Sequence, residues 1–384
     1  MSSYILDRGA LSLVAGAVFS IFTVTAHAQD TVVKVGVAAP MSGANAAYGK
    51  DIEEGVKLAV NEANAKHPVI AGTPVKFEVV SGDDQADPRI GVQVAQQLVD
   101  SGVAFVVGHF NSGTTLPASQ IYAKAGIPML TPSATNPTIT QAGLSTVYRV
   151  IATDAQNAGA AGKYAVLVTK AKRIAIIDDR TAFGQGEADE FEKAVKENGG
   201  TIVDRQFTDD KAVDFSSQLT HVKSSNADLL FCGVLDSQAA MIVKRMKQLG
   251  MKTQFVGGGG VVDADFIKLA GSASEGAMAW EYGHPLASTN SGKQFAGDFK
   301  KVYGTDMLAY APFAYDAARL TIKAMEQANS VKPELFNAAI KSIDYEGSTG
   351  KIVFEKNGDL KNASSTLYEV KNGAWNPLAT KSGG

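Results

Sequence analysis

Two clusters of small hydroxyl residues stand out because each directly follows a short apolar run. The motif NSGTT at residues 111–115 follows the run at 103–108, and TPSATN at 131–136 follows 128–130. Apolar runs of this length are typical of buried strands, and proline favours a helix that begins at Pro117. Hydroxyls and free backbone N–H groups at neighbouring strand ends favour a bound anion, such as a carboxylate or phosphate. For either turn alone, ordinary helix capping is the alternative interpretation.

Motifs of other chemistries are missing from the sequence. It contains no GxxxxGK[ST] phosphate loop, no HExxH motif and no GxSxG elbow, so His109 beside Ser112 is interpreted as structural. The GQG at 184–186 lacks the third glycine of a dinucleotide motif, because position 189 is Asp. A single cysteine, Cys232, excludes an intrachain disulfide, and its apolar surroundings predict a buried, inert thiol. We therefore expect no catalytic residue, no cofactor and no metal ion.

The composition fits an exported globular protein. The 384 residues are 45% hydrophobic and 20% charged, and a net charge of -3 argues against a nucleic-acid partner. This length suggests two domains. Arg8, the apolar stretch 10–26 and the Ala-His-Ala at 26–28 are typical of a secretory signal peptide cleaved after Ala28. An uncleaved membrane anchor is the alternative.

Strands and helices alternate along the rest of the chain. Apolar runs predict strands at residues 32–39, 75–81, 103–108, 128–130, 173–178, 201–207, 229–233 and 254–256, and the intervening segments have helical spacing. Alternation of this kind predicts α/β lobes with doubly wound parallel sheets, and ligands of such sheets bind beyond the carboxyl ends of the strands. The rhythm occurs in both halves of the chain, so we expect two lobes of like fold with a cleft between them.

The run GHFNSGTT…PAS…GIPMLTPSATNP resembles the periplasmic leucine/isoleucine/valine-binding proteins of ABC importers. The resemblance extends from KVGVAAPMSG at 34–43 to NGD at 357–359. It implies a type I periplasmic-binding-protein fold, in which three chain crossings form the hinge, here near Thr153, Tyr282 and Glu355. The expected division is signal peptide 1–28, lobe 1 at 29–153 plus 282–355, and lobe 2 at 154–281 plus 356–384.

The same resemblance implies a set of ligand-binding residues. Ser112, Ser133, Ala134 and Thr135 would hold a ligand carboxylate, which neutral donors can bind without a buried lysine or arginine. Tyr48 would cover the ligand, Phe110 and Asn111 would line the pocket, and Phe183 would close it from the second lobe. Packing between the lobes is the alternative for each aromatic residue.

The chain departs from the family at Gly259, where the family has an acidic partner for the ligand ammonium. Two interpretations stay open: either Asp236 supplies the carboxylate, or the ligand has no α-amino group. Asp236 is equally well explained as a helix N-cap. The four glycines at 257–260 would enlarge the pocket or form a flexible turn. If the ammonium site lies here, Gly259→Asp is expected to strengthen the binding of zwitterions.

These observations predict a monomeric solute-binding protein of the periplasm rather than an enzyme. Its lobes would close on a branched-chain or related amino acid, which it would deliver to an inner-membrane ABC permease. The alternative ligand is a non-amino small carboxylate, an amide or an aromatic acid bound by the same fold. An exported hydrolase is the other class considered.

Overall fold

The computed structural model describes residues 1–3 and 30–382. The expected apolar stretch 10–26 and the cleavage position after Ala28 lie outside the described residues. Within the described part of the chain, no helix combines the length and the apolar character needed to span a bilayer.

The first lobe is built on a six-stranded sheet. Its order is β2(Val69–Ile70), β3(Thr73–Asp83), β1(Thr31–Ala39), β4(Phe105–Gly108), β5(Met129–Thr131) and β6(Val147–Arg149). All pairs are parallel except β2 with β3. The helices α1(Ala46–Asn64), α11(Ala311–Ala328) and α12(Pro333–Lys341) supply one core, and α2(Pro88–Asp100), α3(Ser112–Lys124) and α4(Thr138–Gln141) supply another.

The second lobe is built on a seven-stranded sheet. Its order is β15(Ala374–Ser382), β14(Ser364–Lys371), β11(Met278–Tyr282), β10(Gln254–Gly257), β9(Leu229–Gly233), β7(Ile174–Asp178) and β8(Ile202–Phe207). The strands β14 and β15 are antiparallel additions at one edge. The helices α5(Asp154–Leu167) and α6(Ala182–Glu197) accompany one core, and α7(Ser216–Ser224), α8(Asp236–Gln248) and α9(Ala264–Ala270) the other.

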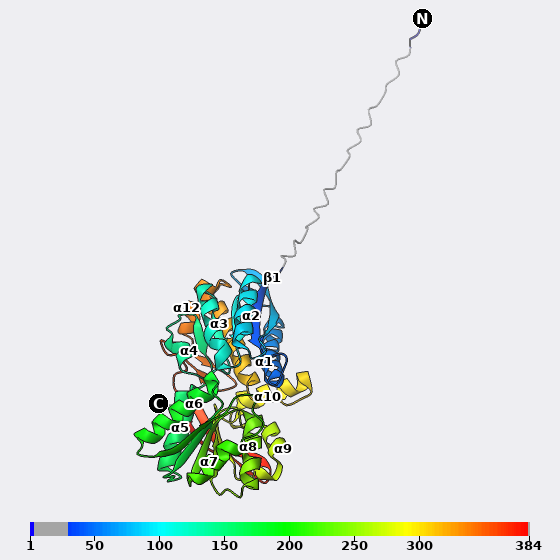
Figure 1. The fold of residues 1–384 in the computed structure, drawn as a ribbon. Helices are drawn as coiled ribbons and strands as arrows, with labels where there is room; N and C mark the ends of the chain where they lie inside the picture. The colour runs from blue at the N-terminus through cyan, green and yellow to red at the C-terminus, as the bar shows by residue number, and fades with distance from the viewer. Residues whose placement is uncertain (4–29, 383–384) are drawn as a thin grey trace.

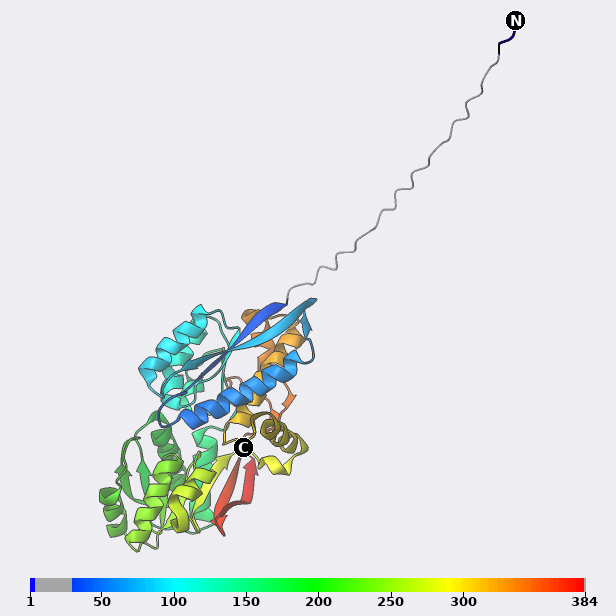
Figure 2. The ribbon, with the colours of Figure 1, turned by 90° about the vertical axis from the view of Figure 1, so that its right-hand side faces the viewer.

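The five parallel strands have the same order in the two sheets, β3-β1-β4-β5-β6 and β8-β7-β9-β10-β11, which confirms the expected α/β architecture of like-folded lobes. In each sheet the first strand of the unit lies between the second and the third, as β3-β1-β4 and β8-β7-β9 show. Figure 1 shows the lobes one above the other, with α1 to α4 and α12 in the upper lobe and α5 to α9 in the lower one. Figure 2 shows the C-terminal strands, in red, within the lower lobe.

The chain passes between the two sheets three times. The connections follow β6, β11 and the short pair β12(Tyr345–Glu346) and β13(Lys351–Ile352), and the second of them leads into α10(Asn290–Tyr303), which packs on α1. Thr153, Tyr282 and Glu355 lie in or next to these connections. The exact lobe boundaries within these connections stay a prediction.

One predicted boundary is wrong. The helix expected to begin at Pro117 begins at Ser112, because Asn111 has the extended backbone of an N-cap residue, with φ -94° and ψ 150°. Pro117 lies inside this helix, where it lacks the N–H that would bond to the preceding turn. The earlier start matters because it places the first N–H groups of α3 at the hydroxyl cluster itself.

Candidate ligand-binding site between the lobes

A cavity of about 200 Å³ lies where the carboxyl ends of the strands of both sheets meet. The first lobe contributes Asn45, Ala86, Pro88, Phe110, Asn111, Ser112, Gly113, Ser133 and Tyr310, and the second contributes Asp179, Thr181, Ala182, Phe183, Asp210 and Leu235. The strand order of each sheet reverses next to these segments, between β1 and β4 and between β7 and β9. Crevices at such switch points are the usual ligand sites of doubly wound sheets.

The two hydroxyl turns converge on this cavity. The Ser112 Oγ accepts hydrogen bonds from the backbone N–H groups of Thr135 and Asn136, both at 3.2 Å. The Ser133 Oγ donates to the Phe110 carbonyl at 2.8 Å. Both serines line the cavity, so the first turn of α3 and the second hydroxyl turn face the same space.

A buried arginine holds the second turn in place. The Arg149 Nη1 donates to the Ala134 carbonyl at 2.7 Å, its Nη2 donates to the Asn136 carbonyl at 3.1 Å, and its Nε pairs with Asp359 at 2.9 Å. Arg149 is fully buried. Its charge is therefore directed at carbonyls and a carboxylate behind the turn, away from the cavity lining.

The cavity lining carries acidic and neutral polar groups. Among the described residues, no lysine, arginine or histidine lines it, whereas Asp179 and Asp210 do. Burial raises the pKa of Asp179 to about 6, although hydrogen bonds from Thr181 oppose the rise. An anionic group here must therefore be bound by hydroxyls and backbone N–H groups. Neither aspartate is among the predicted site residues; the consecutive aspartates at 178 and 179, at the end of a predicted strand, were the available signal.

Aromatic rings close one side of the site. Tyr48 stacks on Phe110 with centroids 5.2 Å apart, and Tyr310 meets both rings edge-on at 5.6 and 5.4 Å. The Tyr48 hydroxyl reaches across to the second lobe, where it donates to Asp236 Oδ1 at 2.8 Å. Asp236 is the first residue of α8 and not its N-cap, which is Leu235. Its carboxylate thus binds Tyr48 and does not line the cavity.

The glycine run makes room for side chains of the protein itself. A Cβ at Gly259 would overlap the ring and hydroxyl of Tyr282, and one at Gly258 would overlap the Glu187 carboxylate. The Gly259 N–H donates to Glu187 Oε1 at 2.9 Å. The enlarged pocket is therefore not found, and Gly259→Asp would have to displace Tyr282, which argues against the expected gain in zwitterion binding. Glu187 was missed because nothing local distinguishes it from a surface glutamate on α6.

The ten predicted ligand-binding residues fall into two groups. Five of them line the cavity: Phe110, Asn111, Ser112, Ser133 and Phe183. The other five do not belong to its lining and lie in the surrounding layer: Tyr48, Ala134, Thr135, Asp236 and Gly259. Ligand contact by any of the ten stays a prediction.

His109 is structural, as predicted. It is fully buried, its Nδ1 lies 2.7 Å from Asp84 Oδ2, and its Nε2 lies 3.1 Å from the Tyr122 hydroxyl. Cys232 is also fully buried, and burial raises the pKa of its thiol. No group of three potential metal-binding side chains occurs in the described part of the chain.

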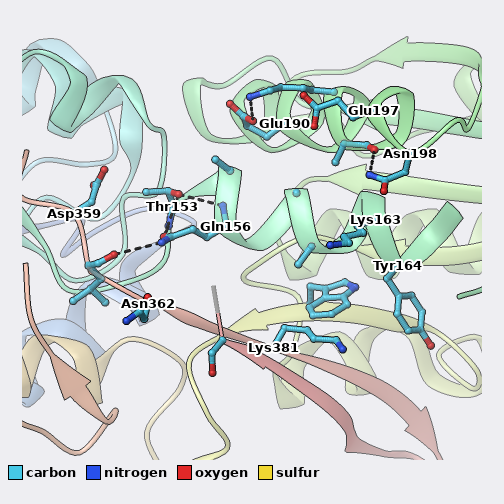
Figure 3. A pocket seen from close by; sticks show the side chains of 18 of the residues that line it. Thr153, Gln156, Lys163, Tyr164, Glu190, Glu197, Asn198, Asp359, Asn362 and Lys381 are labelled. Atoms are coloured by element: carbon cyan, nitrogen blue, oxygen red, sulfur yellow. Dashed lines mark hydrogen bonds and ion pairs between the residues drawn. The ribbon is translucent and has the colours of Figure 1, made fainter. Parts of the chain in front are cut away.

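A larger cavity, of about 780 Å³, lies beside α5, α6 and the connections between the lobes. Some of its polar groups are paired with one another. Thr153 and Gln156 form a capping box, and Lys193 pairs with Glu190, as Figure 3 shows for the side chains of this region. The smaller cavity is the better ligand site despite its size, because unlike groups from both lobes converge on it.

The comparisons with known proteins agree with this geometry. The model of the periplasmic binding protein family matches residues 32–374. The Leu/Ile/Val-binding protein homolog 2 of Brucella abortus (strain 2308) is 33% identical over 342 residues, covering 89% of this chain and 91% of the relative. The chain therefore belongs to the periplasmic binding protein family.

Solved structures have the same fold. The leucine-binding protein LivK of Thermotoga maritima superposes with a TM-score of 0.83 at 29% identity, covering 91% of this chain and 99% of that one. The branched-chain amino acid transporter substrate-binding protein LivJ of Streptococcus pneumoniae, solved with isoleucine, has a TM-score of 0.80 at 26% identity, covering 92% and 99%.

Proposed function

We propose that this protein is the solute-binding component of an ABC importer and that its lobes close on a branched-chain or related amino acid. The observation that carries the proposal is that neutral hydrogen-bond donors and carboxylates line the same cavity from opposite lobes. Neutral donors at the start of α3 face it from the first lobe, and the Asp179 and Asp210 carboxylates face it from the second. A zwitterion has a negative group for the former and a positive group for the acidic side.

The family relationship supports the transport role. The names of the relatives described above say that they bind leucine, isoleucine, valine or branched-chain amino acids. A protein of this kind works by passing its ligand to an inner-membrane permease. We propose that the chain is exported, that its signal peptide is cleaved after Ala28, and that it acts in the periplasm as a monomer. The donors and carboxylates of the cleft then bind a solute and catalyse no reaction.

A thermal-shift panel tests the ligand class. It comprises leucine, isoleucine, valine, threonine and alanine, together with benzoate and propionamide as the alternative ligands. A ligand that binds only the folded protein adds about 2.7 kcal/mol at 100 times its dissociation constant. We expect at least one branched-chain amino acid to raise the melting temperature. A rise with benzoate or propionamide alone, confirmed by calorimetry, would replace the amino acid with that class.

A further inference from the structure

Five polar atoms in the layer behind the cavity lining, which includes none of their residues, lie fully buried without a partner. They are the Thr135 Oγ1, both carboxylate oxygens of Asp154, the Asn157 Oδ1 and the Glu187 Oε2, and none has a hydrogen-bond partner among the described residues. They come from the second hydroxyl turn, from α5 and from α6. Buried polar atoms are almost always paired, because an unpaired one loses its hydration without compensation.

The cluster needs donors rather than acceptors. The other oxygen of Glu187, Oε1, already accepts from the Gly259 N–H at 2.9 Å and from the Tyr282 hydroxyl at 3.2 Å. The Thr135 hydroxyl lowers the pKa of Asp154 but lacks the geometry of a hydrogen bond to it. Arg149, a nearby cation, is occupied by Asp359 and by two carbonyls. Two carboxylates thus face each other with no positive group between them.

The chemistry of the missing partner follows from this set of acceptors. A primary ammonium carries one positive charge and three N–H donors, and it has no acceptor that would remain unpaired. A ligand carboxylate fits the start of α3 instead, because Ser112 lines the cavity and its hydroxyl, which accepts from the Thr135 N–H, can still donate its own proton. The two head groups of an α-amino acid are joined through a single carbon. They would therefore reach these adjoining places together.

We propose that Glu187, supported by Asp154 and the Thr135 hydroxyl, binds the ligand ammonium in place of the side chain that Gly259 lacks. The inference rests on the proposed function and narrows it: the positive end of the same ligand binds at Glu187 rather than at Asp179, whose Oδ1 already accepts from the Thr181 N–H and hydroxyl. The glycine run then has a clear purpose, because only a residue without a side chain at 258 and 259 leaves space for Glu187 and Tyr282.

The ligand-free cluster avoids two adjacent negative charges by holding a proton. Burial raises the pKa of Asp154 to about 7. Burial, and then the charge of Asp154, raise the pKa of Glu187 well above its ordinary value. An arriving ammonium replaces this proton as the positive partner.

The test compares Glu187→Gln with the unsubstituted protein, using leucine and its des-amino analogue 4-methylpentanoate in titration calorimetry. We expect the substitution to weaken leucine binding by about tenfold to hundredfold, the usual range for a lost charged hydrogen bond. Binding of 4-methylpentanoate should stay the same or improve. The ligand-free variant should melt at the same or a higher temperature, because a buried charge has been removed, whereas a merely structural glutamate would lower it.

Asp316→Asn is the matched control. Asp316 is equally buried, but its carboxylate is satisfied by the backbone N–H groups of Ser348 and Thr349, both at 2.8 Å, away from the cleft. The Asp316→Asn substitution should lower the stability of the protein. It should leave the ratio of the dissociation constants of leucine and 4-methylpentanoate unchanged. If Glu187→Gln does not fold, the same ratio is measured in Asp154→Asn.

The outcomes separate the two proposals. Leucine binding with an unchanged ratio in the Glu187→Gln protein overturns the ammonium site and leaves the proposed function in place. Equal affinity of the unsubstituted protein for leucine and 4-methylpentanoate overturns the ammonium site as well. Failure of every amino acid in the panel to bind overturns the proposed function itself.

Discussion

The Tyr48 hydroxyl lies 2.8 Å from Asp236 Oδ1, and this hydrogen bond joins helix α1 of one lobe to the start of α8 in the other. The same hydroxyl lies 3.0 Å from Asp263 Oδ2. A phenol has one proton, so the second contact requires a protonated carboxyl. Burial, then the charge of Asp236, raise the pKa of Asp263 to about 7, which is consistent with a shared proton.

Tyr48→Phe should therefore weaken closure while keeping the aromatic stack on Phe110. The lost bond to a carboxylate corresponds to about 1.5 to 3 kcal/mol in the closed state, and we expect ligand affinity to fall roughly tenfold or more. Titration calorimetry measures it. Tyr303→Phe is the control, because its hydroxyl donates to the Glu54 carbonyl within one lobe. Equal losses in both variants would contradict a role in closure.

Ser112→Ala should weaken binding by removing the hydroxyl on which the two turns meet. The variant leaves the backbone N–H groups of Thr135 and Asn136 without their acceptor, so we expect about a tenfold loss of affinity. Ser119→Ala lies two turns along the same helix, where the hydroxyl donates only to the Leu116 carbonyl. Isothermal titration in which the two alanine variants bind alike would count against Ser112.

The stability of the ligand-free protein should fall as the pH rises from about 4 to 7. The folded-state pKa of Asp154 is raised from 3.8 to about 7 by burial. Because folding favours the protonated form, the contribution of Asp154 is fully present below its ordinary pKa of 3.8 and is lost as the pH rises through about 7. In the Asp154→Asn variant the free energy of unfolding should lose this pH-dependent contribution, which amounts to up to roughly 4 kcal/mol. Urea unfolding at several pH values measures it, and an unchanged slope in the variant would rule out Asp154 as its source.

Arg149→Met should destabilise the first lobe. It leaves the Ala134 and Asn136 carbonyls and the Asp359 carboxylate without their shared donor. Removing one partner of a buried ion pair costs about 3 to 5 kcal/mol. Chemical denaturation should show this loss, together with weaker ligand binding because the second hydroxyl turn is no longer held. Arg173→Met, at an exposed site, should change stability far less.

Local patterns were sufficient for the architecture. The strands and helices follow from apolar runs and helical spacing, as α1 shows by burying Ile52, Val56 and Ala59 on one face. The convergence of Ser112 with the second hydroxyl turn was also predictable, because both follow neighbouring parallel strands, whose carboxyl ends share one edge of the sheet.

The partners of individual side chains were decided only by the tertiary structure. Glu187 and Gly259 are 72 positions apart, and Tyr48 and Asp236 are 188 apart. No local period relates such residues. Gly259 could be recognised in the sequence as a missing carboxylate, but the presence of Tyr282 and Glu187 in the space beside it depends on how strands and helices of different sequence regions pack. Apolar periodicity acts over a few residues and fixes the elements, whereas the volume and charge around a buried group are set by whichever distant segments the closed fold brings against it.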